Sequence, residues 1–150
     1  YYVATVIHAY RRAIDDFYAE KPFDEELLKE VCKVSHREYS EGFYFSQPEQ
    51  IYTYGSYIRS CELIGTVKEY DEENKVAVVE QRNRFYKGDE VEFLPPTGDY
   101  IKFRIEDMED ADGNPIDVAP HPQMTVRIKV PVKLPPQTIV RKECECSEPV

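Results

Sequence analysis

The sequence contains no apolar run approaching the roughly 20 residues of a membrane-spanning helix, and it does not open on a charged-then-apolar leader. We therefore expect a cytoplasmic protein with no membrane partner. An excess of positive charge is also missing, since the formal net charge is -10 at pH 7. Such a chain repels phosphates at long range, so as a whole it is not expected to be a free-standing nucleic-acid binder. A local basic face is compatible with this charge.

Metal-binding and catalytic motifs are equally sparse. The cysteines Cys32, Cys61, Cys144 and Cys146 show no C-x-x-C spacing, and a C-x-C end offers at most two of the roughly four ligands of a structural zinc. We expect reduced, unligated thiols. No G-x-S-x-G, H-E-x-x-H or glycine-rich phosphate loop occurs, so nucleophilic, zinc-hydrolase and nucleotide-binding classes lack their minimum parts. A thiol–base pair of Cys32 with His36 is disfavoured, because Cys32 follows an apolar helical face.

The opening segment, YYVATVIHAYRRAIDDFYAEK, has the period of an amphipathic helix. Its apolar stripe consists of Val3, Val6, Ile7, Tyr10, Ile14 and Phe17. Each large apolar side chain is worth roughly 1.5–3 kcal/mol when buried, so we expect the stripe to pack against a neighbour upstream of this chain. A second, short helix is predicted in FDEELLKEV, with Asp24 as its N-cap.

From Leu63 onward the pattern changes to short strands about ten residues apart, with no helix between them. ELIGTVKEYD and NKVAVVEQR flank an acidic turn, and in EVEFL the pattern places Val91 and Phe93 inward and Glu90 and Glu92 outward. A closed barrel, unlike a sandwich, leaves no exposed sheet edges. The sequence therefore predicts a mostly β fold: a small antiparallel six-stranded β-barrel preceded by two α-helices.

One acidic segment, Glu106–Asp117, resembles a calcium-binding loop. Aligned on its glycine, however, it places Met108 and Ala119 where an EF-hand needs oxygen ligands. We interpret Asp112-Gly113 as a tight hairpin turn.

Cationic side chains are concentrated in two places. The run from Met124 to Lys142 has five basic residues and no acid. A second group, Arg82, Arg84 and Lys87, surrounds the aromatic residues Phe85 and Tyr86. Cations interleaved with aromatics are typical of proteins that bind single-stranded RNA. The predicted RNA or substrate contacts are Arg82, Arg84, Phe85, Tyr86, Lys87, Arg127 and Lys129. A solvated strand face explains the same residues without a ligand, and both interpretations stay open.

The segment VSHREYSEGFYFSQP carries four aromatics but has neither a helical nor a strand period. We expect it to form a junction between two structural units, with the aromatic rings packing and the glycine allowing a close turn. The junction residues are His36, Arg37, Tyr39, Gly42, Phe43, Tyr44 and Phe45. The alternative is that His36, Arg37 and Tyr39 reach an upstream active site or touch RNA.

Several segments resemble a known family. In chain order they are YYVATV, AYRRAID, VSHREY, GFYF, GTVKEYD, VEQRNRFYKGDEVEFL, DADGNPIDVAPHPQ and VRIKVPV. The first four resemble the end of the catalytic portion of the collagenase-like peptidases, peptidase family U32. The others resemble that family's C-terminal barrel domain. The resemblance covers nearly the whole chain in the family's order.

The resemblance implies a TIM-like catalytic barrel upstream, with this chain starting near its final helix. Residues 1–60 would be the helical segment and connector, 61–143 the C-terminal β-barrel domain and 144–150 a tail. Several family members carry an iron-sulfur cluster on cysteines of the catalytic barrel, but the cysteines here do not match that pattern. No cofactor is expected in this part of the protein. The KGDEVEF hairpin is also similar to the second domain of translation elongation factors.

Although the family is catalogued as proteases, related members serve in RNA hydroxylation. One reaction is a prephenate-dependent modification of a tRNA wobble uridine, and a counterpart acts on ribosomal RNA. By this resemblance we expect an accessory region, inactive by itself, that binds and orients tRNA for the catalytic domain. Two alternatives stay open: the barrel recognises a protein substrate for a collagen- or peptide-hydrolysing parent, or it is a structural module that joins two subunits.

Overall fold

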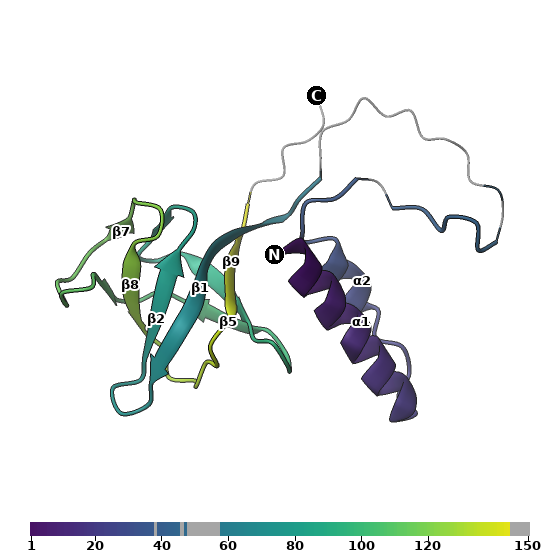
Figure 1. Cartoon of the computed structure of the whole chain (residues 1–150), viewed down its shortest axis with the longest axis horizontal. Coiled ribbons are helices and arrows are strands. Elements are labelled where there is room, and N and C mark those ends of the chain that lie inside the picture. The colour runs from purple at the N-terminus through teal and green to yellow at the C-terminus, as the bar shows by residue number, and fades with distance from the viewer. Residues whose placement is uncertain (38, 46, 48–57, 145–150) are drawn as a thin grey trace. The chain divides into compact units, whose positions relative to one another are not determined.

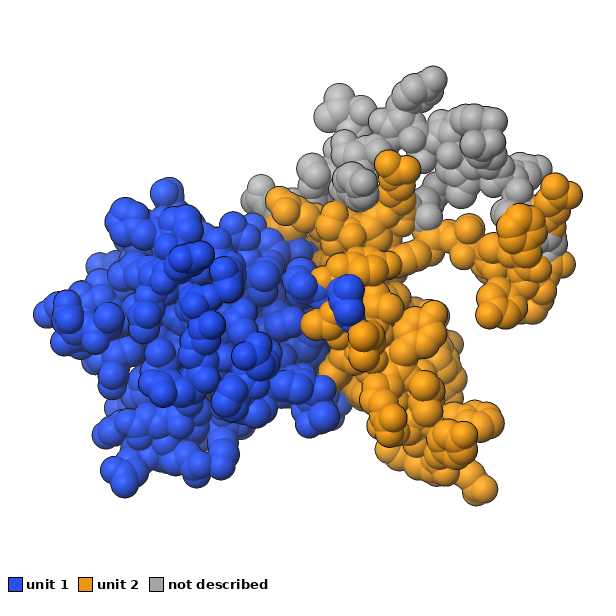
Figure 2. Space-filling model, in the orientation of Figure 1, with its two compact units in different colours: residues 1, 3, 61–143 blue, residues 2, 4–60, 144–150 orange. Residues whose placement is uncertain are grey.

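The computed structural model describes residues 1–37, 39–45, 47 and 58–144 of the chain. It contains two compact units (Figure 2). The helical unit comprises residues 2, 4–60 and 144–150, and the β unit comprises residues 1, 3 and 61–143. Glu38, Ser46 and Pro48 of the predicted junction segment, and Cys146, lie outside the described residues.

The helical unit contains α1 (Tyr2–Tyr18) and α2 (Glu26–Val31), which lie side by side (Figure 1). The N-cap of α2 is Glu25, one residue after the predicted Asp24. The Asp24 carboxylate still accepts a hydrogen bond of 3.0 Å from the Glu26 N–H. No helix among the described residues is long and apolar enough to cross a membrane.

The apolar stripe predicted on α1 is largely exposed. The exposed fractions of Ile7, Tyr10 and Phe17 are 62%, 66% and 77%. The described residues of this chain therefore do not bury the stripe.

The β unit consists of short strands that pair antiparallel throughout. Their bounds are β1 (Cys61–Asp71), β2 (Val76–Gln81), β3 (Phe85–Tyr86), β4 (Glu90–Leu94), β5 (Ile101–Arg104), β6 (Met108–Glu109), β7 (Val118–Ala119), β8 (Thr125–Lys129) and β9 (Ile139–Glu143). Seven of them form one sheet in the order β5-β4-β9-β1-β2-β8-β6, which curves into a half-barrel, and β3 pairs with β7. The predicted fold class is confirmed. The strands are more numerous than the predicted six. The additional ones, β3, β6 and β7, are only two residues long, which is too short to show an alternating pattern in the sequence.

The β1–β2 hairpin shows how local chemistry sets the register. The Asp71 carboxylate accepts hydrogen bonds from the N–H groups of Glu73 and Asn74, both 3.0 Å, which closes the predicted acidic turn. Nearer the start of β1, Gly65 lies beside a shift in the register between β1 and β9. A Cβ at Gly65 would lie 2.5 Å from Cγ1 of Val79, so only glycine lets β1 and β2 approach this closely.

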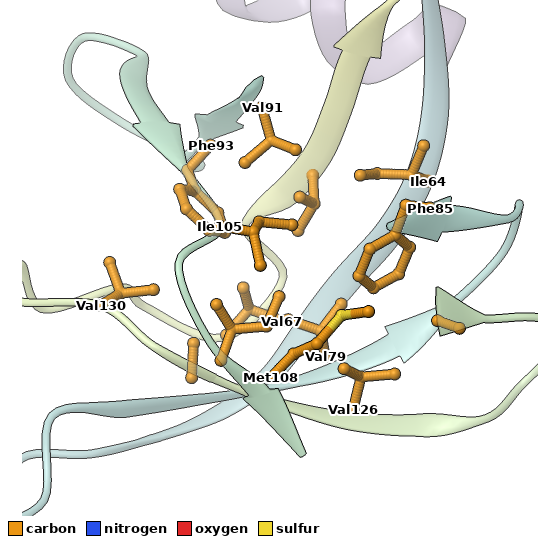
Figure 3. Packing of buried hydrophobic residues seen from close by; sticks show 14 of the residues in the cluster. Ile64, Val67, Val79, Phe85, Val91, Phe93, Ile105, Met108, Val126 and Val130 are labelled. Carbon is orange, nitrogen blue, oxygen red and sulfur yellow. The ribbon is translucent and has the colours of Figure 1, made fainter. Parts of the chain in front are cut away.

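Buried apolar side chains from all parts of the β unit meet in one core (Figure 3). The strand pattern explains this: on β8, Val126 and Ile128 are buried and Arg127 and Lys129 point to the other face. The predicted alternation on β4 is only partly right. Val91 and Phe93 are buried as expected, but Glu92, predicted to face outward, is also buried.

Candidate nucleic-acid interface

Three of the predicted cationic contacts lie around one hollow of the β unit. Lys87 directly follows β3, whereas Arg127 and Lys129 lie two residues apart on β8 and so share a face. We call this hollow, of about 440 Å³, the charged hollow. Its lining residues are Asn74, Val76, Lys87, Asp107, Met108, Glu109, Pro115, Ile116, Asp117, Arg127 and Lys129. The fold thus joins cations that are 40 residues apart in the sequence.

The three cations are balanced by carboxylates in the same wall. Nζ of Lys87 lies 2.9 Å from Oδ1 of Asp107, and Nε of Arg127 lies 3.7 Å from Oε2 of Glu109. The Asp107 carboxylate raises the pKa of Lys87 above its ordinary value, and the same hydrogen bond lowers the pKa of Asp107. With Asp117 as the third acid, the charged hollow is formally neutral. It is therefore not a simple anion site.

The remaining predicted contacts have different surroundings. Arg82 forms an ion pair with Glu80, and Arg84 is exposed and forms no ion pair with any residue that the structure describes. Tyr86 is half exposed, with Nζ of Lys142 5.7 Å from its ring centroid. Phe85 has an exposed fraction of 0% and belongs to the core, so its prediction as a stacking contact is wrong. The period-2 side-chain alternation of β3 sends its ring inward and that of Tyr86 outward.

Several features of the site could not be predicted from the sequence. The acids of the charged hollow come from the segment Glu106–Asp117, in which we predicted a hairpin turn at Asp112-Gly113. The structure confirms this turn: the Gly113 N–H donates to the Asp110 carbonyl, and Gly113 adopts φ +85°.

The run from Met124 to Lys142 contains no acid in the sequence, but the fold brings an acid from another strand next to it. Arg141 is fully buried, with one nitrogen 2.7 Å from Glu92. The cross-strand register, which pairs Glu92 with Arg141, decides this.

The seven predicted junction residues all lie in the described part of the chain. Nδ1 of His36 lies 3.1 Å from the carbonyl oxygens of both Val34 and Ile58. Since carbonyls only accept hydrogen bonds, Nδ1 carries the hydrogen, and in the neutral ring Nε2 is the unprotonated nitrogen. The His36 ring stacks on Tyr39, with centroids 4.4 Å apart, and the Tyr39 hydroxyl donates to the carbonyl of Val31. This part of the junction is a packed and hydrogen-bonded cluster.

The other junction aromatics are not covered by any residue that the structure describes. Phe43, Tyr44 and Phe45 are exposed, as is Arg37. Gly42 adopts φ +57°, the left-handed conformation expected for a glycine that turns the chain. Packing of these rings against an upstream domain stays a prediction.

A metal site is not evident in the described ranges. No group of three His, Cys, Asp or Glu side chains among these residues is placed to hold a metal ion. The iron-sulfur cluster that the resemblance implies for the catalytic barrel stays a prediction.

Family models match both parts of the sequence. Residues 59–141 match the peptidase family U32 C-terminal domain, and residues 1–53 match peptidase family U32. The chain belongs to peptidase family U32. This confirms the resemblance seen in the motifs.

Curated U32 relatives carry names that refer to tRNA. The tRNA hydroxylation protein P1 of Bacillus subtilis is 35% identical over an alignment of 148 residues, and the match covers 95% of this chain and 35% of the relative. The tRNA hydroxylation protein P of Escherichia coli is 38% identical over an alignment of 139 residues, and the match covers 89% of this chain and 30% of the relative. This chain thus spans about a third of the length of the curated relatives it matches.

Two solved structures of a U32 C-terminal domain are similar to this chain. Two crystal structures of the C-terminal domain of a Geobacillus thermoleovorans protein assigned to the U32 peptidases each give a TM-score of 0.52. One is 44% identical and covers 54% of this chain and 99% of that domain; the other is 40% identical and covers 56% and 93%. Together with the mostly β sheet, they show a U32 C-terminal domain.

Proposed function

We propose that this chain is the accessory region of a U32 protein that binds and orients tRNA for hydroxylation of a wobble uridine. The catalytic domain upstream carries out the reaction, and this chain alone has no activity. Support comes from the relatives named for tRNA hydroxylation, whose similarity extends over both units of the chain.

The observation that carries the proposal is the convergence of Lys87, Arg127 and Lys129 on one hollow. Arg84 adds an exposed cation on the same unit. Because the hollow's own acids and the net charge of -10 oppose a polyanion, binding is weak and depends strongly on salt. Contacts of this kind position RNA without reading its sequence.

A titration of labelled tRNA at two salt concentrations tests this. The triple variant Arg84→Glu, Lys87→Glu, Lys129→Glu should bind tRNA more weakly. The slope of the logarithm of the binding constant against the logarithm of the salt concentration should decrease by about one unit per lost phosphate contact. The matched control changes Lys102, Arg104 and Lys133 to Glu, since Lys102 and Arg104 line a different hollow and Lys133 pairs with Glu72. Equal effects of the two triple variants, or no binding at low salt, contradict the proposal.

The reaction itself is tested in cells. Mass spectrometry of tRNA from a deletion strain should show the loss of wobble-uridine hydroxylation, restored by the full-length gene and not by the gene with the three cation changes. Intact hydroxylation in the deletion strain contradicts the proposed reaction. Cleavage of denatured collagen by the full-length protein, free of contaminating protease, would instead support the peptidase alternative that the family's name suggests.

The helical unit supplies the proposed contact to the catalytic domain. Beside the exposed stripe of α1, a hollow of about 250 Å³ opens between the two helices. It is lined by Ala9, Tyr10, Ala13, Phe23, Leu27, Leu28 and Val31. An apolar face of this extent is costly in water, and residues 1–53 match the main family model rather than the C-terminal one. We expect the catalytic domain to cover it; concentration-dependent mass of the full-length protein in sedimentation would instead indicate subunit contact.

A further inference from the structure

The lining of the charged hollow combines two kinds of side chain. Four residues are apolar, and we call them the floor: Val76, Met108, Pro115 and Ile116. The others carry three cations, three carboxylates and one carboxamide, and we call them the wall. The volume of about 440 Å³ is within the roughly 300–1,000 Å³ of sites that take small ligands. A lining that combines apolar side chains with hydrogen-bonding groups suits a flat ligand that has an apolar face and hydrogen-bonding edges.

One cation of the wall is only loosely paired. The Arg127 side chain is 37% exposed, and its ion pair with Glu109, at 3.7 Å, is longer than a hydrogen bond. The outer N–H groups of its guanidinium are therefore available to an acceptor on a ligand. The neighbouring carboxylates of Asp107, Glu109 and Asp117 would repel a bare phosphate but accept N–H donors.

We propose that the charged hollow holds one unpaired nucleotide of the RNA substrate, with the base on the apolar floor and the sugar-phosphate chain at the rim. Lys87 and Lys129 contact the backbone, and Arg127 donates to a ring nitrogen or carbonyl of the base. The inference depends on the proposed RNA-binding function and adds that the bound nucleotide is unpaired. A base in a duplex is stacked and paired and cannot enter, whereas single-stranded segments offer bases that are free to do so.

The first test compares a short single-stranded RNA with the same RNA annealed to its complement, by fluorescence anisotropy with the whole chain. We expect the single strand to bind more tightly, although the duplex carries more charge. Arg127→Met should weaken single-strand binding about tenfold, in the range that one lost base contact causes. Lys102→Met, which removes the same charge outside the hollow, should leave it nearly unchanged.

The second test removes apolar contact without changing charge. Ile116→Ser on the floor should weaken single-strand binding several-fold, whereas Val132→Ser, an exposed position outside the hollow, should not. If Arg127→Met does not fold, Lys129→Met on the exposed side of β8 takes its place.

The outcomes separate the two proposals. If tRNA binds but the duplex competes as well as the single strand, or if Ile116→Ser behaves like Val132→Ser, the nucleotide site is wrong and RNA binding stands. If no RNA binds at low salt, the proposed function fails and the nucleotide site fails with it.

Discussion

In the β unit the large apolar side chains meet in one buried cluster, whereas in the helical unit many of them lie on the surface. Phe85 at 0% exposed and Phe17 at 77% exposed represent the two situations. Both patterns follow regular periods in the sequence, period 2 in the strands and a helical period in α1. A regular apolar period therefore predicts that a face will be covered, and does not say whether the same chain supplies the cover.

The largest expected effect lies in the β core. Phe85→Ala should lower the free energy of unfolding by about 3–5 kcal/mol, because it leaves a cavity among fully buried side chains. Phe17→Ala, on the exposed face of α1, should change it by less than about 0.5 kcal/mol. Urea unfolding followed by tyrosine fluorescence measures both. Similar losses for the two phenylalanines would remove the contrast between the units.

The buried ion pair comes next. Arg141→Met leaves the Glu92 carboxylate buried without its main partner and should cost about 3 kcal/mol. The value is at the low end of the usual range because Nζ of Lys102 lies 3.9 Å from the same carboxylate. Lys133→Met breaks the exposed pair with Glu72 and should cost less than about 1 kcal/mol. Equal costs, measured by the same urea unfolding, would mean that burial does not distinguish these pairs.

A third variant tests whether the α1 stripe has a missing cover. Ile7→Gln should change the free energy of unfolding of this chain by less than about 0.5 kcal/mol, since the side chain is already exposed. In the full-length protein the same change should cost about 2 kcal/mol, the value of a buried isoleucine. An equally small effect in both forms contradicts the proposed contact with the catalytic domain.

The smallest effect concerns pH. The Asn114 side chain and N–H donate to the Asp110 carboxylate and lower its pKa. A carboxylate whose folded pKa is below its unfolded value of about 3.9 stabilises the fold above that value, and this contribution is lost as pH falls through the folded pKa. Asp110→Ala should therefore reduce the drop in Tm between about pH 6 and about pH 3. Asp112→Ala, in the same turn, is the control; an unchanged drop for Asp110→Ala would show that the turn does not depend on this carboxylate.

Much of the fold was predictable because local chemistry decides it. The acidic β1–β2 turn, the Asp112-Gly113 turn and the inward side chains of β8 each depend on a few neighbouring residues. The candidate site was predictable only in part. Lys87 and the two β8 cations were identified, but the acids that neutralise them come from a segment whose sequence predicts only a turn.

Phe85 shows why the rest could not be predicted. It is flanked by arginine, tyrosine and lysine, so its local sequence is the same as that of a stacking platform for RNA. A strand of two residues is too short for an alternation pattern to show which side chain faces the core. The choice depends on which neighbours arrive from other strands.

The sequence by itself determined the family, the mostly β character of residues 61–143 and the amphipathic helix at the start, because periodicity, turn residues and family motifs are local properties of the chain. Only the tertiary structure decided that Arg141 is buried against Glu92 and that the cations of the charged hollow are matched by acids. The physical reason is that charge pairing depends on distances between strands that are remote in sequence, and the register of the sheet sets those distances.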